Sequence, residues 1–240
     1  MRTLMTGLAV LVSSVTLLGC LVQCKFEQFA DLSPKKYTYG IDVSHHQKQI
    51  DWPQLKDGKA RFVYIKATEG ATFRDPRFIE NWNGAQQAGL IPGAYHFFTF
   101  CRSGADQAEN FLQVFRQVKG THLPVAIDVE LAGNCPTRPT PDELASELNS
   151  FIDRVKAGTG CRMLFYTTPG FYDSYLAGHF DHYPLWLQSF NKKPGLKSKR
   201  AWNIWQFSNQ GRVDGIEKPV DLNVFKGSQE AFEQFICYKK

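Results

Sequence analysis

The sequence lacks the short motifs that identify several large enzyme classes. It contains no G-x-S-x-G nucleophile motif, no glycine-rich phosphate-binding loop and no H-E-x-x-H zinc motif. Cys-x-x-Cys spacing is also absent, which argues against a zinc ribbon. The histidine pairs at 45/46 and 179/182 have no known zinc spacing, and we interpret them as cleft or surface residues. We therefore expect no metal and no cofactor.

Extreme charge is missing too. The net charge of +5 and the pI of about 8.8 distinguish poorly between anionic partners, and we expect a monomer without a nucleic-acid partner. No internal repeat and no second domain are visible. With 240 residues, 43% of them hydrophobic, the chain is long enough for one well-buried core.

Charge is also absent from the N-terminal segment between Arg2 and Lys25. An apolar stretch there predicts a signal peptide over residues 1–19. Its last residues, Leu17-Leu18-Gly19-Cys20, resemble the lipobox of bacterial lipoproteins, which predicts a lipid on Cys20 and a place in the periplasm or on the cell surface. An ordinary cleaved signal of a secreted protein and an uncleaved anchor are the alternatives. We expect residues 20–36 to form a tether and residues 37–240 to form the single folded domain.

The rest of the chain alternates short β-like runs with helical patterns, which is typical of βα units around a parallel sheet. Eight runs favour a closed barrel over an open sheet. Connections with helical periodicity are clear in the first half, and the segments after Thr168 are short. The expected strands span 39–43, 62–67, 91–98, 125–129, 163–167, 185–190, 203–207 and 220–225.

Helix boundaries carry recognisable capping signals. Ser103 is placed to cap a helix that ends before Gly120. Thr140 and Glu143 form a capping box with proline at the first helical position. A last helix near residues 228–236 is expected to close the barrel.

The strongest chemical pattern is Ala126-Ile127-Asp128-Val129-Glu130. Residues i and i+2 of a strand lie on one face, so Asp128 and Glu130 point the same way at the end of a buried strand. Two carboxylates this close cannot both ionise freely, and one pKa should rise. That is the arrangement of a general acid beside an ionised carboxylate. The alternative is a pair of solvated acids that begin a loop or cap a helix.

Further acids and aromatic residues mark other strand ends. Asp42 ends the first expected strand and Asp221 begins the last, so both could share a barrel mouth with Asp128 and Glu130. Aromatic rings stack on sugars, and amides fix their orientation. A single aromatic residue belongs more often to the core, but the recurrence of aromatics at strand ends favours substrate contacts. Besides Asp221, the candidate substrate-binding residues are Lys66, Tyr95, Tyr166, Trp186, Trp205 and Gln206.

Several longer motifs together resemble glycoside hydrolase family 25, the Chalaropsis-type lysozymes. The resemblance covers residues 38–226 and includes the Asp128-x-Glu130 pair. The sequence departs from the family pattern at Leu187-Gln188-Ser189-Phe190. There we would expect a small residue and a tyrosine after the tryptophan and the aliphatic residue. The matching segments are Tyr39–Gln47 with Ile50–Trp52, Phe62–Gly70, Asp75–Phe78, Ala88–Phe97, Trp205–Gln206 and Val220–Asn223.

The resemblance implies an α/β fold, a single incomplete TIM-like barrel with (β/α)5 followed by three β-strands with short connections. It implies hydrolysis of the β-1,4 bond between N-acetylmuramic acid and N-acetylglucosamine in peptidoglycan, with retention. Glu130 would be the general acid/base and Asp128 would stabilise the intermediate, as nucleophile or by orienting the substrate's acetamido group. Asp42 and Asp221 would be supporting carboxylates, and Tyr166 a hydrogen-bonding helper.

Two rival functions remain open. A chitinase-like barrel glycosidase also ends a strand with Asp-x-Glu. A non-catalytic peptidoglycan-binding module could retain the cleft, although the acids at 42, 128 and 130 argue against it.

Export makes disulfides possible. Cys101 and Cys135 follow neighbouring strands at one barrel mouth, and we predict that they pair. Cys237 lies after the last helix, where either Cys24 or Cys161 could meet it.

Overall fold

The computed structural model describes residues 32, 33, 35–56 and 58–237. The predicted signal peptide, Cys20 with its predicted lipid, Cys24 and most of the predicted tether lie outside these residues. The described residues from Lys35 onward form one compact unit, whose first strand begins at Tyr37. Among the described residues, no helix combines the length and the apolar character that a membrane crossing needs.

Eight strands close into a barrel-like sheet within a mixed α/β fold, as the number of β-like runs predicted. The order is β1-β9-β8-β7-β6-β5-β4-β2, and pairing of β1 with β2 closes the ring, while the two-residue strand β3 extends β2. Within the ring all neighbours are parallel except β9, which is antiparallel to both β1 and β8, and outside the ring β3 is antiparallel to β2. The strands are β1 (Tyr37–Val43), β2 (Phe62–Glu69), β3 (Phe73–Arg74), β4 (Ile91–Phe97), β5 (Val125–Asp128), β6 (Met163–Thr167), β7 (Leu185–Gln188), β8 (Ile204–Val213) and β9 (Ile216–Lys226).

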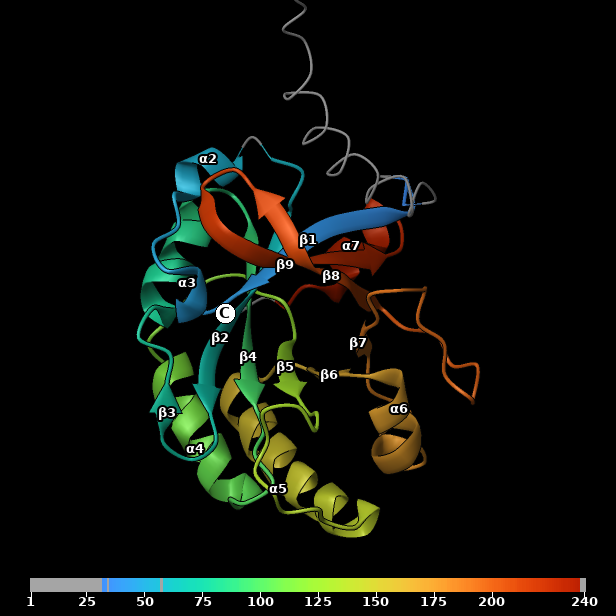
Figure 1. Ribbon diagram of the computed structural model, residues 1–240. Coiled ribbons are helices and arrows are strands. Elements are labelled where there is room, and N and C mark those ends of the chain that lie inside the picture. The colour runs from blue at the N-terminus through green and yellow to red at the C-terminus, as the bar shows by residue number, and fades with distance from the viewer. Residues whose placement is uncertain (1–31, 34, 57, 238–240) are drawn as a thin grey trace, which may run out of the picture. The chain divides into compact units, whose positions relative to one another are not determined.

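Helices follow the first five strands of the barrel. Figure 1 shows α3, α4 and α5 along the outside of the green part of the sheet, whereas β8 and β9 follow one another as a hairpin. Ser103 caps α4 and the capping box at Thr140 opens α5, as expected. The helices are α2 (Trp52–Lys56), α3 (Phe78–Gln87), α4 (Gly104–Phe115), α5 (Pro141–Thr159), α6 (Pro169–Phe171), followed by a π-helical turn (Tyr172–Leu176), and α7 (Gln229–Phe235).

The last two strands are longer than the sequence indicated. We expected strands over 203–207 and 220–225, but β8 runs to Val213 and β9 starts at Ile216. Register shifts interrupt their pairing. Polar and glycine residues in these strands also break the simple alternation on which the prediction relied, so the predicted strands were too short. In β7 the opposite error occurred: the strand ends at Gln188 rather than at residue 190.

The barrel interior is filled with aromatic side chains, and α7 closes the end where the parallel strands begin. Phe232 of α7 packs against Phe62, the first residue of β2, and against Phe225 of β9. Ser228 caps this helix, as the sequence suggested. α7 does not cover the opposite end of the barrel, where the parallel strands finish, and a substrate can bind there.

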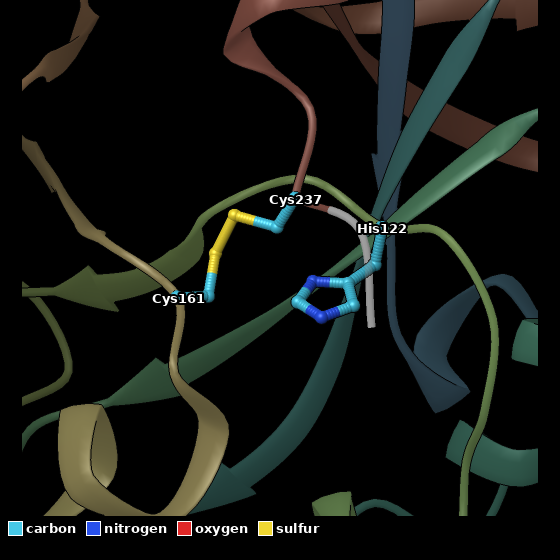
Figure 2. A group of neighbouring side chains, drawn as sticks. All are labelled: His122, Cys161 and Cys237. Atoms are coloured by element: carbon cyan, nitrogen blue, oxygen red, sulfur yellow. A yellow bond between two sulfur atoms is a disulfide. The ribbon is translucent and has the colours of Figure 1, made fainter. Parts of the chain in front are cut away.

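Two disulfides tie the unit together. Cys101 pairs with Cys135, which confirms the predicted bridge at the mouth (Cα–Cα 6.2 Å). At the closed end Cys161 pairs with Cys237, one of the two partners left open. Figure 2 shows His122 beside this second bridge, and one of its ring nitrogens lies within 4.8 Å of both sulfur atoms. Because the sulfur atoms are bonded to each other, they do not offer metal-binding thiolates here.

Candidate active site

A pocket of about 270 Å³ opens at the ends of the parallel strands. Most of the residues predicted for the site line it, although they come from seven different strands or the loops after them. Sequence reasoning did not predict Gln188, Phe190 and Asn209 as part of this wall. The lining residues are Asp42, Tyr95, Asp128, Glu130, Tyr166, Trp186, Gln188, Phe190, Gln206, Asn209 and Asp221.

Backbone hydrogen bonds fix the segment that carries Asp128 and Glu130. The backbone N–H of Val129 donates to the carbonyl of Tyr166 (3.0 Å), and the hydroxyl of Thr167 donates to the carbonyl of Val129 (2.7 Å). Asn134 donates its amide N–H to the carbonyl of Glu130 (3.0 Å). Strand β5 is thus extended past its last ladder residue, which keeps both carboxylates on the pocket side.

Burial sets the ionisation of these two acids. Asp128 is 7% exposed, and desolvation together with the nearby charge of Glu130 raises its pKa well above the ordinary range. One of its oxygens, Oδ1, is buried without a hydrogen-bond partner among the described residues. Burial and then the charge of Asp42 raise the pKa of Glu130 to about 7. A carboxyl group with this pKa can both donate and accept a proton near neutrality.

Asp42 lies opposite Asp221 across the β1–β9 pair, as the neighbouring first and last strands suggested. Its oxygen Oδ2 accepts hydrogen bonds from the Gln206 amide (2.9 Å) and the Asn223 amide (2.7 Å). Asn223 is oriented in turn by the indole N–H of Trp186, which donates to its Oδ1 at 2.8 Å. The motif Val220–Asn223 contained Asn223, but nothing in its spacing marked the amide as a partner of Asp42.

Asp42 and Asp221 share one proton. Burial raises the pKa of Asp42, while the hydrogen bonds from Asn223, Gln206 and Asp221 oppose that rise. The pKa of Asp221 is raised to about 9 by burial, by the charge of Asp42 and by its own hydrogen bond to Asp42. Asp221 therefore holds the proton at neutral pH and donates it to Asp42, which is the acceptor of the pair.

Aromatic side chains form the pocket floor. The ring of Trp186 stacks on Tyr64 inside the barrel (centroids 4.6 Å apart) and meets Tyr166 edge to face (4.6 Å). Burial raises the pKa of Tyr166 well above 10, and the surrounding acids raise it further, so its hydroxyl keeps its proton. The Tyr166 hydroxyl donates this proton to Gln206 Oε1 at 2.9 Å.

Two predicted substrate contacts are not brought to this pocket. Trp205 is buried, packs against Trp202 and Phe207, and donates its indole N–H to the carbonyl of Ser189 (2.8 Å). Since Gln206 is its neighbour and faces the pocket, strand alternation turns Trp205 the other way. Lys66 forms an ion pair with Glu69 (2.7 Å) and does not line the pocket.

Comparison with known proteins gives a consistent result. Residues 41–216 match the model of glycosyl hydrolases family 25. The chain is 38% identical over 216 residues to YegX of Escherichia coli K12, covering 88% of this chain and 78% of the relative. It is 35% identical over 200 residues to lysozyme M1 of Streptomyces globisporus, covering 79% and 68%.

Solved structures agree with that match. A family 25 glycosyl hydrolase from Bacillus anthracis superposes with a TM-score of 0.75 and 36% identity, over 82% of this chain and 92% of the other. A bacterial lysozyme from Streptomyces coelicolor gives a TM-score of 0.72 and 32% identity, over 81% and 94%. Both similarities span most of the barrel.

Proposed function

The chain belongs to glycosyl hydrolase family 25, and from that premise we propose that it is a muramidase, a glycosidase that cleaves the glycan strands of peptidoglycan. The bond cut is the β-1,4 linkage between N-acetylmuramic acid and N-acetylglucosamine. The observation that carries the proposal is the cluster of four carboxyl groups in one pocket, among which Glu130 has a pKa of about 7. No cofactor enters the reaction.

Glu130 is the proposed general acid/base. In its protonated form it gives its proton to the glycosidic oxygen as the bond to the anomeric carbon breaks. It then removes a proton from the water that attacks the same carbon, and so returns to its starting state. The pKa of about 7 supports both roles, because proton donors and acceptors work best when their pKa lies near the working pH.

Asp128 is the proposed stabiliser of the intermediate. Its oxygen Oδ1 is buried without a hydrogen-bond donor among the described residues, and a donor group of the substrate would compensate for the water that this oxygen has lost. An acetamido N–H bound there would turn the acetamido oxygen toward the anomeric carbon; attack by Asp128 itself is the covalent alternative. Both routes give retention. Asp42, held by Gln206 and Asn223, supplies the fixed negative charge beside them.

The remaining site assignments follow the pocket. Tyr95, Tyr166, Trp186, Gln206 and Asp221 are proposed substrate-binding residues because all of them line it. The five helix-bearing connections support describing the fold as (β/α)5 followed by three strands. For the N-terminal segment we propose a signal peptide over residues 1–19 and a lipid on Cys20. The protein would then be an exported, monomeric lipoprotein.

Digestion of defined peptidoglycan tests the function. We expect soluble muropeptides whose new reducing end is N-acetylmuramic acid, identified by borohydride reduction and mass spectrometry, and none from the Glu130→Gln variant. A new N-acetylglucosamine reducing end would contradict the bond assignment. Release of chitin oligomers but no muropeptides would favour the chitinase-like alternative, and sedimentation with intact sacculi by an inactive wild type would favour a binding module.

A further inference from the structure

Gln188 is a pocket residue that the proposed mechanism does not use. It is the last residue of β7, two positions after Trp186, so both side chains point into the barrel mouth. Its amide nitrogen Nε2 donates to the hydroxyl oxygen of Tyr166 at 3.0 Å. This contact is the first step of a chain of hydrogen bonds that runs from Gln188 through Tyr166 and Gln206 to Asp42.

The direction of this chain is fixed from its far end. Asp42 Oδ2 accepts from the amide nitrogens of Gln206 and Asn223, and an amide nitrogen can only donate. Because the nitrogen of Gln206 faces Asp42, its carbonyl oxygen Oε1 faces Tyr166. That oxygen carries no proton, so the Tyr166 hydroxyl must donate to it.

A phenol has one proton and two accepting positions. Once the proton of Tyr166 points at Gln206, the Tyr166 oxygen can only accept from other groups. Gln188 therefore presents its nitrogen rather than its oxygen, and it occupies one of the two accepting positions. One accepting position of the Tyr166 oxygen remains.

We propose that Gln188 is a positioning residue that holds Tyr166 as a hydrogen-bond acceptor toward the bound saccharide. The inference rests on the proposed function and specifies its recognition chemistry. Tyr166 accepts from an N–H or O–H of the sugar and does not donate to a sugar carbonyl. If residue 188 offered an acceptor instead of a donor, it would compete with Gln206 for the Tyr166 proton, and without any donor there the Tyr166 hydroxyl would lose the contact that holds its oxygen in place.

A double-mutant cycle tests the link between the two residues. Gln188→Met keeps the length of the side chain and removes the donor without adding charge. We expect it to lower kcat/KM for muropeptide release by about tenfold, mainly through KM, which corresponds to the loss of one hydrogen bond. In a Tyr166→Phe background the same change should cost almost nothing, because the hydroxyl that Gln188 orients is gone.

Gln188→Glu sharpens the test. A carboxylate can only accept, so Tyr166 has to turn its proton away from Gln206. We expect a loss larger than that of Gln188→Met. Gln54→Met is the matched control, since its exposed amide bonds Asp51 outside the pocket, and it should retain wild-type kinetics. Equal losses for Gln188→Met with and without the Tyr166 hydroxyl would overturn the proposal.

A measurement without substrate separates this inference from the proposed function. In protein labelled with ¹³C at tyrosine Cζ, the Tyr166 resonance, assigned by its absence in Tyr166→Phe, reports the hydrogen bonds of its hydroxyl. Gln188→Met should shift it and Gln54→Met should not. An unshifted resonance contradicts the role of Gln188 whatever the activity. If Gln188→Met shifts the resonance but the wild type releases no muropeptides, only the muramidase proposal is contradicted.

Discussion

The two sides of the barrel are built differently and contribute different chemistry to the pocket. The side formed by β2, β4, β5 and β6 is backed by the long helices α3, α4 and α5, and it supplies the acids Asp128 and Glu130. The connections within the side formed by β7, β8 and β9 carry no helix, and this side supplies the amides of Gln188, Gln206 and Asn223. Reactive groups thus come mainly from one side and orienting groups from the other.

Asp42 stands at the junction between the two sides. Its strand β1 pairs with β2 on one edge and with the antiparallel strand β9 on the other. The amides bond its Oδ2, while its charge raises the pKa of Glu130 across the pocket. The amide-rich side can therefore influence the pKa of Glu130 on the helix-backed side through the charge of Asp42.

The largest effect is expected on the helix-backed side. Asp128→Asn keeps the size of the side chain but removes the carboxyl group that is proposed to stabilise the intermediate, so we expect kcat to fall about 10²- to 10³-fold. Turnover of purified peptidoglycan measures it. Asp214→Asn, at the exposed tip of the β8–β9 hairpin, is the control and should be neutral. Turnover of Asp128→Asn close to that of the wild type would remove Asp128 from the mechanism.

The two disulfides offer the next comparison. Cys101–Cys135 joins the mouth loops and spans 34 residues, whereas Cys161–Cys237 spans 76 residues and ties the chain end to the start of β6. Replacing either pair with serine should cost about 3 kcal/mol of stability, which lowers Tm on the order of 10 °C. Calorimetry measures Tm, and turnover well below Tm measures the site.

The expected pattern of activity differs between the two bridges. Loss of Cys101–Cys135 should reduce turnover at low temperature, since the loop between Glu130 and Cys135 is anchored there through Asn134. Loss of Cys161–Cys237, at the closed end of the barrel, should leave low-temperature turnover unchanged. Equal turnover of the two variants would mean that the mouth bridge does not position the acids.

The helix-backed side was also the more predictable one. Capping signals at Ser103 and Thr140 and the alternation of Asp128 with Glu130 are local, and local rules place them. Polar and glycine residues with register shifts hid the length of the β8–β9 hairpin. Trp205 was grouped with Gln206 although adjacent strand residues face opposite ways, a conflict that the sequence already contained.

Amides were the hardest group to identify from the sequence. Carboxylates at strand ends stand out because burial makes them costly, but an amide such as Gln188 or Asn223 is neutral and common. Their partners are remote: Asn223 bonds a carboxylate 181 residues away. Such contacts depend on barrel closure, so only the folded chain reveals them.

A smaller effect concerns stability and comes from the strand-rich side. Asp221 has a folded-state pKa of about 9 against an ordinary value of 3.8, so folding favours its protonated form. Its contribution to stability is therefore present at low pH and is lost as pH rises from about 4 to about 9. Asp221→Asn keeps a donor toward Asp42 and cannot ionise. We expect it to be more stable than the wild type by on the order of 2 kcal/mol at pH 8.

Denaturant unfolding at several pH values measures this difference. The stability advantage of Asp221→Asn should shrink toward zero as the pH falls below about 4, where the wild-type carboxyl becomes protonated in both states. Asp214→Asn, with its exposed side chain, should show no such pH dependence. An advantage of Asp221→Asn that stays constant from pH 4 to pH 9 would indicate a packing effect and would contradict the shared proton.

The smallest predicted effect tests whether Asp42 couples the two sides. Its negative charge disfavours ionisation of Glu130, so Asp42→Asn should lower the pKa of Glu130 from about 7. The acid form needed for the first step is then lost at lower pH, and the alkaline limb of kcat/KM moves down by less than one pH unit. Gln206→Met should move it much less, because it removes a hydrogen bond to Asp42 but leaves the charge in place. An alkaline limb that stays fixed in Asp42→Asn would show that burial alone sets the pKa of Glu130, leaving the orienting side no electrostatic control over the reactive one.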